Sequence, residues 1–253
     1  MGFQIEAACI SHMGRIRGNN EDNFYFNGQS LMAEHESMPE PVTGVFSSSE
    51  KIAVAVFDGM GGENAGETAS YAAAEAFRKI CRQTKISKTG LLQMMRTLNV
   101  QVCKKAEEEK LGQIGTTATI LYFYADYAYI ANVGDSPAYI LRNGRLKQIS
   151  EKHTNEELLR LSGLKNRTPA LTQFLGIAEE ELYLEPYLAG VELEAGDICL
   201  LCSDGLTDMV TKENIQAILS NHMSSRHMVT TLLETALQHG GRDNITIICC
   251  RVC

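Results

Sequence analysis

Short apolar segments typical of β-strands fill much of the chain, and two of their connections are too short for anything but a tight turn. Asn143-Gly144 separates AYILR from RLKQIS and is a strong two-residue hairpin signal. Ala125-Asp126 joins TATILYFY to YAYIANV in the same way. Such connections link antiparallel neighbours, because parallel strands need a long crossover. The middle of the chain is therefore predicted to form antiparallel sheet.

Helical periodicity appears in four separate segments. Apolar residues recur at helical spacing from Ala69 to Ile80 and from Leu91 to Ala106. KENIQAILS and RHMVTTLLETALQ predict two more helices, the second closed by Gly240-Gly241. Strands and helices come in groups and do not alternate, which favours an α+β fold with antiparallel sheets flanked by helices. The polar segment 28–50 is predicted to be a surface loop.

Charge and cysteine usage restrict the classes of partner and compartment. The net charge of -8 argues against nucleic-acid and anionic-membrane partners, which favour basic surfaces. The N-terminal residues lack the apolar region of a signal peptide, so we expect a cytoplasmic protein whose eight cysteines are reduced thiols. Cys199 and Cys202 form a CxxC, but on a strand they would point to opposite faces and could not share a zinc ion.

The stretch VFDGMGGE places an aspartate, Asp58, at the end of an apolar strand and several glycines directly after it. A phosphate-binding P-loop needs a lysine after its glycines, and none is present. The glycine spacing also departs from GxGxxG, the dinucleotide-binding pattern. With both patterns excluded, we interpret this stretch as an acid at a strand end, followed by a turn made of small residues.

The same arrangement of an acid at a strand end recurs along the chain, at Glu21, Asp22, Asp135, Asp204 and Asp243. A single such acid is most simply a turn former. Acids that converge on one edge repel each other unless cations lie among them, and Mg²⁺ and Mn²⁺ take oxygen ligands. Two such ions bridged by a carboxylate can hold a hydroxide for in-line attack on phosphorus.

A two-metal phosphoester hydrolase also needs a group that binds the phosphate. Arg17 lies four residues before Glu21, and a guanidinium can bind two phosphate oxygens at once. Arg15 competes with Arg17 on spacing alone. The residues by themselves indicate such a hydrolase and leave its substrate open.

Seven motifs occur in an order that resembles the metal-dependent Ser/Thr protein phosphatases of type 2C (the PPM family), in their compact bacterial form. They are RGNNEDN, VFDGMGGENAGETAS, GTTATI, ANVGDSPAYILRNGRLKQIS, LTQFLGI, LLCSDGLTDMV and GGRDNITIICCRV. The resemblance extends from about Glu6 to Val252. It implies a single catalytic domain over residues 1–253, built as a four-layer α-β-β-α sandwich with the metals in a cleft at one edge.

The resemblance also implies a role for each acid. Asp58 would bridge two Mn²⁺ or Mg²⁺ ions, and Gly59 would offer its carbonyl oxygen. Asp204 and Asp243 would complete the shell of one ion, and Glu21 with Asp22 would serve the other, directly or through water. A third, weaker ion would be held by Asp135 together with Asp204. Arg17 would bind the phosphate.

Three features depart from the family pattern. Met60 stands where many eukaryotic members carry a histidine proposed as general acid, although bacterial relatives commonly have methionine there. Pro137 replaces the usual arginine, and an effect on substrate contacts beside Asp135 is expected. The segment 153–171, which corresponds to the flap of bacterial relatives, is short, so a more open cleft is expected. None of the six histidines is predicted to be catalytic, and His153 is interpreted as a turn residue.

The function that the resemblance implies is hydrolysis of phosphoserine and phosphothreonine in proteins, in opposition to a Ser/Thr protein kinase, by a monomeric enzyme. A non-catalytic phosphatase-like binding module is the alternative from another class. Hydrolysis of small phosphoesters is an alternative that keeps the same chemistry.

Overall fold

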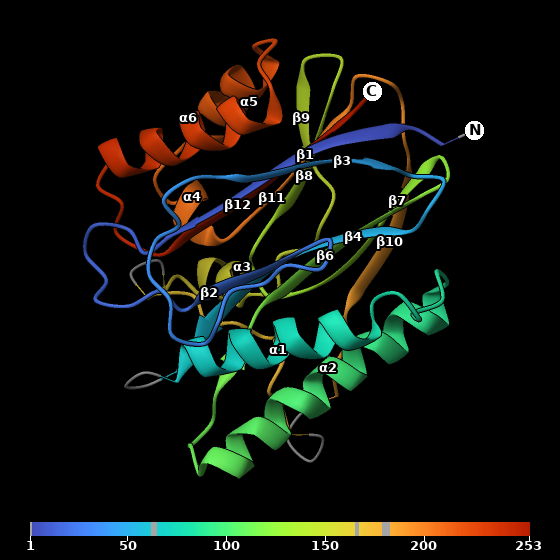
Figure 1. Cartoon of the computed structure of the whole chain (residues 1–253). Helices are drawn as coiled ribbons and strands as arrows, with labels where there is room; N and C mark the ends of the chain where they lie inside the picture. Colours follow the sequence, from blue (N-terminus) through green and yellow to red (C-terminus); the bar gives the residue numbers. More distant parts are fainter. Residues whose placement is uncertain (1, 62–64, 165–166, 179–182) are drawn as a thin grey trace.

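The computed structural model describes residues 2–61, 65–164, 167–178 and 183–253, whose strands form two antiparallel sheets (Figure 1). The first sheet has the order β3-β1-β12-β11-β8-β9, with bounds Val42–Ser47, Gln4–His12, Ile245–Val252, Ile198–Cys202, Ala138–Arg142 and Arg145–Gln148. The second has the order β10-β7-β6-β4-β2, with bounds Tyr187–Glu192, Tyr127–Val133, Ala118–Tyr124, Ile52–Met60 and Asp22–Phe26. The short strand β5 (Gly115–Thr116) pairs with β4 beyond the end of β6.

Helices cover the outer face of each sheet. The long helices α1 (Gly66–Ile80) and α2 (Lys88–Glu109) pack on the second sheet, and α4 (Asp204–Thr207), α5 (Lys212–Ser220) and α6 (Ser225–Gln238) pack on the first. Three apolar cores result, one between the sheets and one between each sheet and its helices. The predicted four-layer α-β-β-α architecture is confirmed.

The two predicted hairpins are present, and their turns have the expected backbone. Asn143 and Gly144 have φ angles of 50° and 72°, so both are in the left-handed region that a type I′ turn requires. Ala125, at the other hairpin, has φ 52°. The short connections thus fixed the pairing of β6 with β7 and of β8 with β9.

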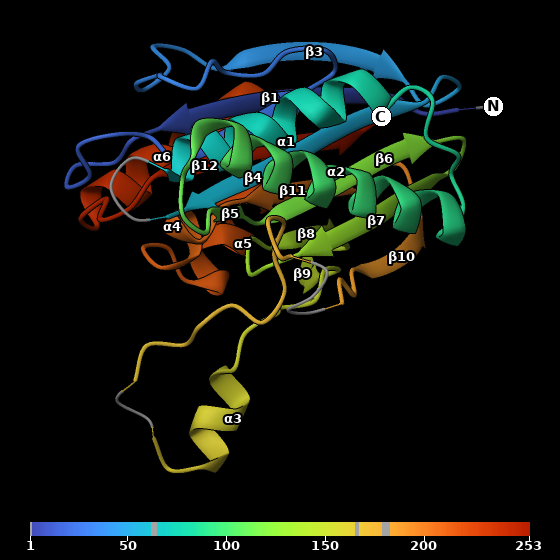
Figure 2. The same cartoon turned by 90° about the horizontal axis from the view of Figure 1, so that it is seen from below.

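Segment 28–50, predicted to be a surface loop, contains strand β3, so that prediction is wrong for its second half. β3 pairs with β1, and its alternating exposed residues give it too little apolar character to be recognised. Strand β10 was also missed, because it lies at a sheet edge and buries none of its residues fully. Within the flap, helix α3 (Glu156–Leu161) buries no residue and extends away from the rest of the chain (Figure 2).

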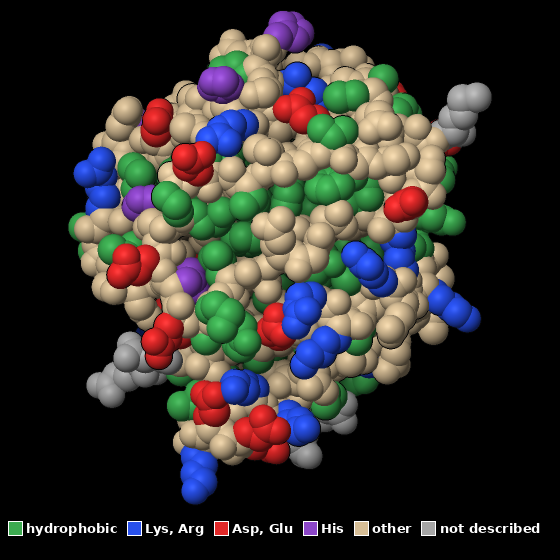
Figure 3. All heavy atoms as spheres, in the orientation of Figure 1, with side chains coloured by type: hydrophobic (Ala, Val, Ile, Leu, Met, Phe, Trp, Pro, Cys, Tyr) green, Lys and Arg blue, Asp and Glu red, His purple; other side chains and the backbone are tan. Residues whose placement is uncertain are grey.

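The cysteines behave as predicted. All eight are free thiols. Cys199 faces the core between the sheets and Cys202 faces the helices on the other side, so the CxxC pair diverges. Among the described helices, none is both long and apolar enough to cross a bilayer. On the face drawn in Figure 3, basic and acidic side chains are interspersed.

Candidate metal centre

Two aspartates from neighbouring strands face each other at one end of the second sheet. In the antiparallel pairing of β2 with β4, Asp22 lies directly opposite Asp58. Directly paired residues point to the same face, with Cβ atoms about 5 Å apart. Two carboxylates are therefore held side by side at the edge of the sandwich, where like charges oppose folding unless a cation separates them.

Strand β4 does not end at Asp58, as the sequence had indicated, but continues through Gly59 to Met60. Gly59 pairs with Thr116 of β5, and its N–H donates to the carbonyl oxygen of Glu21 at 3.1 Å. A Cβ on Gly59 would lie 2.1 Å from the carbonyl oxygen of Gly66, so only glycine allows helix α1 to begin this close. The following residues 62–64, part of the predicted turn, lie outside the described residues.

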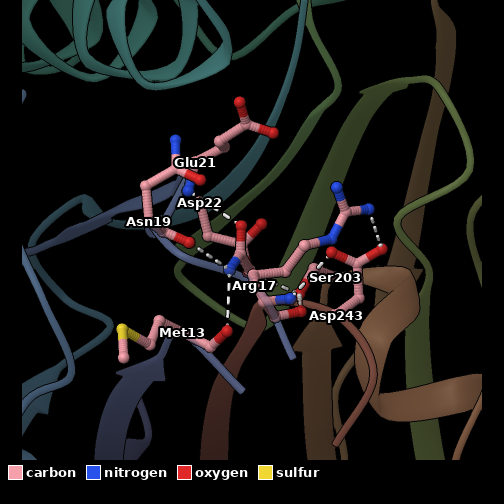
Figure 4. Close-up of polar contacts among 8 residues, drawn as sticks. Met13, Arg17, Asn19, Glu21, Asp22, Ser203 and Asp243 are labelled. Atoms are coloured by element: carbon pink, nitrogen blue, oxygen red, sulfur yellow. Dashed lines mark hydrogen bonds and ion pairs between the residues drawn. The ribbon is translucent and has the colours of Figure 1, made fainter. Parts of the chain in front are cut away.

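The loop before β2 is fastened to the loop before β12 by one amide side chain (Figure 4). Nδ2 of Asn244 donates to the carbonyl oxygens of Met13 and Asn19, and its Oδ1 accepts from the N–H of Glu21. The neighbouring residue Asp243 is thereby brought to the same place as Glu21.

Arg17, in that same loop, points toward the acids. Its Nη2 lies 2.7 Å from Oδ2 of Asp243. Arg15 instead donates through Nε to the carbonyl oxygen of Leu237, at the end of α6. The structure therefore separates the two candidate arginines, and Arg17 is the one among the carboxylates.

Asp204 and Asp135 complete the acidic surroundings from two other elements. Asp204 is the first residue of α4, directly after Ser203, the N-cap that follows β11. The hydroxyl of Ser203 donates to Oδ2 of Asp22 at 2.7 Å, which links that helix start to β2. Asp135 follows β7 after Gly134, whose φ of 97° favours glycine.

Burial and mutual repulsion raise the pKa of the central acids. Burial, opposed by the Ser203 hydrogen bond, raises the pKa of Asp22 to about 7. Burial and the carboxylate of Asp135 raise the pKa of Asp204 to about 7. Burial, then Asp22 and Asp204, raise the pKa of Asp58 well above its ordinary value. The five aspartates and Glu21 form one electrostatically linked acidic cluster, consisting of Glu21, Asp22, Asp58, Asp135, Asp204 and Asp243.

The donor set of this acidic cluster fits hard divalent cations. It offers carboxylate oxygens and, next to Asp58, the backbone carbonyl of Gly59, which are the kinds of ligand that Mg²⁺ and Mn²⁺ prefer. Oδ1 of Asp22 is buried without a hydrogen-bond partner, which a cation or its water would supply. In the described part of the chain, no three His, Cys, Asp or Glu side chains are close enough to hold one ion between them. Ions that keep most of their waters suit such spacing.

Several residues around the acidic cluster were not predicted from the sequence. Ser203 and Asn244 hold it through hydrogen bonds, and Oγ1 of Thr117 accepts from the backbone N–H of Asp58 at 3.1 Å. Asp208 lies one turn after Asp204. Its charge helps to raise the pKa of Asp204, but less than burial and Asp135 do. The i, i+4 spacing on a short helix was the available signal for Asp208.

Lys152 is a further unpredicted residue near the acids. It is the cation whose charge lowers the pKa of both Asp135 and Asp208, against the larger raising effect of burial. The backbone N–H of the next residue, His153, donates to the carbonyl oxygen of Gly134, which places this segment beside Asp135. His153 therefore makes a backbone contact there, but residues 151–153 form no turn, contrary to its interpretation as a turn residue.

Two departures from the family pattern can be located. Met60 lies against Gly115, where a Cβ would come within 2.7 Å of its methyl carbon. Pro137 is buried, and its carbonyl oxygen accepts from the N–H of Cys202. Pro137 thus supports the first sheet, and the expected effect of the missing arginine on substrate contacts beside Asp135 stays a prediction.

Comparison with known proteins identifies the family. The protein phosphatase 2C family model matches residues 42–240. The serine/threonine phosphatase stp of Listeria welshimeri is 32% identical over 260 residues, covering 96% of this chain and 94% of that protein. The crystal structure of the Mycobacterium tuberculosis serine/threonine phosphatase PstP/Ppp superposes with a TM-score of 0.78 at 30% identity, covering 98% of each chain.

A further solved structure bears on the metal. The catalytic domain of the serine/threonine protein phosphatase PstP in complex with two manganese ions matches with a TM-score of 0.77 and 30% identity, covering 98% of this chain and 99% of that one. The fold, the acidic cluster and these matches agree, and the chain belongs to the protein phosphatase 2C family of metal-dependent phosphatases.

Proposed function

We propose that this protein is a Mg²⁺- or Mn²⁺-dependent Ser/Thr protein phosphatase that hydrolyses phosphoserine and phosphothreonine in proteins. The observation that carries the proposal is the directly opposed pair Asp22 and Asp58, with one buried Asp22 oxygen left without a partner. Two buried carboxylates side by side destabilise the fold when both are ionised. A divalent cation bound between them would compensate their charge.

The acids of the cluster would divide between two ions. Asp58 would contact both, with the carbonyl oxygen of Gly59 beside it. Asp204 and Asp243 would hold one ion, and Glu21 with Asp22 would hold the other, directly or through water. When bound, the two ions would supply charge neutralisation at the phosphate and activation of a water for in-line attack. The assignment of a third ion to Asp135 and Asp204 stays a prediction.

Arg17 would bind and orient the phosphate. Its Nη2 contacts Asp243, and about half of the side chain is exposed. The contact with Asp243 fixes the guanidinium plane, so two parallel hydrogen bonds to phosphate oxygens need little further ordering. Met60 has no proton to donate, so the leaving serine or threonine oxygen would take its proton from water.

The biological setting remains a set of predictions. A phosphoprotein phosphatase would oppose a Ser/Thr protein kinase, and the relatives that match here are named as serine/threonine phosphatases. We also propose that residues 1–253 form a single catalytic domain, and that the protein is a monomer in the cytoplasm.

Hydrolysis of p-nitrophenyl phosphate tests the proposal. The purified protein is assayed with Mn²⁺, with Mg²⁺ and with EDTA, beside the variant Asp204→Asn. Turnover that requires metal and is abolished by both EDTA and the substitution is expected. Absence of turnover with either metal, from protein shown to be folded by circular dichroism, would favour a non-catalytic binding module instead.

A further inference from the structure

A groove opens between the edge strands of the two sheets, away from the acidic cluster. β9 ends the first sheet and β10 ends the second. Between them lies a space of about 500 Å³ with an apolar floor of Ile140, Ile149 and Val191. We call this space the β9/β10 groove.

The register of the β8/β9 hairpin shows why the sandwich stays open here. Ile140 belongs to the core between the sheets, and it pairs directly with Lys147. Arg142, two residues further along β8, pairs with Arg145. All of these side chains therefore occupy the inward face of the sheet. A closed sandwich would carry apolar residues at such positions, but here three are cationic, so the second sheet cannot cover them.

The cations of the groove are not equally compensated. Arg142 forms two hydrogen bonds with the buried carboxylate of Asp197 and an ion pair with Glu194. Arg145 and Lys147 are exposed and have no ion pair with any described residue. No Asp or Glu lies among the groove's described lining residues, although the chain as a whole carries a net charge of -8. Arg145 and Lys147 are therefore the two cations of the groove that no described acid compensates.

We propose that the β9/β10 groove docks an extended, acidic segment of the protein substrate, a role that rests on the proposed phosphatase function. Arg145 and Lys147 are two residues apart on a strand, so their Cα atoms are separated by about 6.8 Å. An extended partner carries residues i and i+2 at that same spacing, so acids at alternate positions match both cations. Ile149 follows Lys147 at the same spacing and faces the same side, so an aliphatic side chain at position i+4 of the partner reaches the floor formed by Ile149 and Val191.

Edge strands favour an extended partner over a helical or globular one. β10 is the free edge of its sheet over six residues, and an added strand can pair with such an edge through main-chain hydrogen bonds. The groove is also connected to the acidic cluster along the chain. From Ile149 the chain runs to His153, whose N–H donates to the carbonyl oxygen of Gly134 beside Asp135. A docked segment would therefore tether the substrate near the acidic cluster.

Binding of a fluorescein-labelled peptide, Asp-Ser-Asp-Ser-Ile, whose two acids and isoleucine lie on one face when extended, tests the groove by fluorescence polarisation in EDTA. Without metal the catalytic cleft is acidic and repels this probe, so binding reports on the groove. Binding is expected to weaken with added salt and to fall about tenfold in Arg145→Glu/Lys147→Glu. The double variant Lys85→Glu/Lys88→Glu makes the same charge change on exposed lysines of the α1–α2 connection and α2, and it should bind like the wild type.

A substrate assay then separates this inference from the proposed function. A phosphothreonine peptide is compared with the same peptide extended by a Gly-Ser linker and the acidic segment. The extended peptide should have a lower KM than the short one with the wild type and with Lys85→Glu/Lys88→Glu, but not with Arg145→Glu/Lys147→Glu. Turnover of p-nitrophenyl phosphate should be the same in all variants. Equal KM values with normal turnover, or equal probe binding by both double variants, would overturn the docking proposal alone. Absence of turnover on every substrate would overturn the proposed function.

Discussion

Replacing Asp22 with Asn is expected to stabilise the metal-free protein at pH 8, because it removes a charge that the fold buries. The ordinary pKa of the carboxyl is 3.8, and in the folded chain it rises to about 7. Each pKa unit corresponds to about 1.4 kcal/mol, so ionised Asp22 destabilises the metal-free fold by at most about 4 kcal/mol. Asp58 shares part of this effect, because the two groups repel each other when both are ionised.

The direction of the pH dependence follows from the raised pKa. Well below pH 4 the carboxyl is protonated in both states and has no effect on unfolding. As the pH rises toward 7 the unfolded state loses its proton first, so the free energy of unfolding falls. Well above pH 7 the carboxyl is ionised in both states, and the free energy of unfolding falls no further through this group. Mn²⁺ should reverse it in the wild type, because an ion bound only by the folded state stabilises that state.

Urea unfolding in EDTA at pH 5 and at pH 8 measures this effect. The free energy of unfolding of Asp22→Asn should exceed that of the wild type by more at pH 8 than at pH 5. Mn²⁺ should stabilise the wild type more than the variant. Asp126→Asn, at an exposed hairpin turn, is the matched control and should show no such difference. A wild type that in EDTA is more stable than Asp22→Asn at pH 8 would refute the reasoning.

Three further predictions concern single side chains. Arg17→Ala should raise KM for a phosphopeptide by about tenfold or more, with Arg17→Lys between it and the wild type; equal KM values in steady-state kinetics would exclude Arg17 from phosphate binding. Met60→Leu should keep kcat within about threefold, since a thioether donates no proton; a much larger loss would show that Met60 has a chemical role. Cys253, the exposed thiol, should react first with Ellman's reagent, whereas buried Cys199, whose pKa burial raises to about 12, should react only on unfolding; early labelling of Cys199, located by mass spectrometry, would contradict this.

The parts of the fold that were predictable are those with strong local signals. Asn143-Gly144 admits few backbone conformations, and the helical periodicity before Ile80 repeats over several turns. Strands β3 and β10 lacked such signals. Both lie at sheet edges, where one side of the strand has no neighbour and exposed residues break the apolar run. Their pairing is decided by tertiary contacts.

The residues of the candidate site likewise separate into those with a local sequence signal and those without one. The acids were predictable as residues at the ends of strands, because each lies beside a strong strand or glycine signal. That Asp22 faces Asp58 depends on the β2/β4 register, which no local pattern specifies. The supports Ser203 and Asn244 are common polar residues whose importance appears only when the partners they bind are known. The continuation of β4 through Gly59 follows from pairing with β5, a strand of two residues.

Phosphate release from a phosphothreonine peptide, measured for the wild type and for Asp58→Asn, tests the central claim most directly. Asp58 is the acid assigned to both ions, and its replacement leaves the strand pairing with Asp22 in place. The account predicts Mn²⁺-dependent release by the wild type, with EDTA and Asp58→Asn each removing it. Full release by folded Asp58→Asn, or release by the wild type that persists in EDTA, would contradict the account.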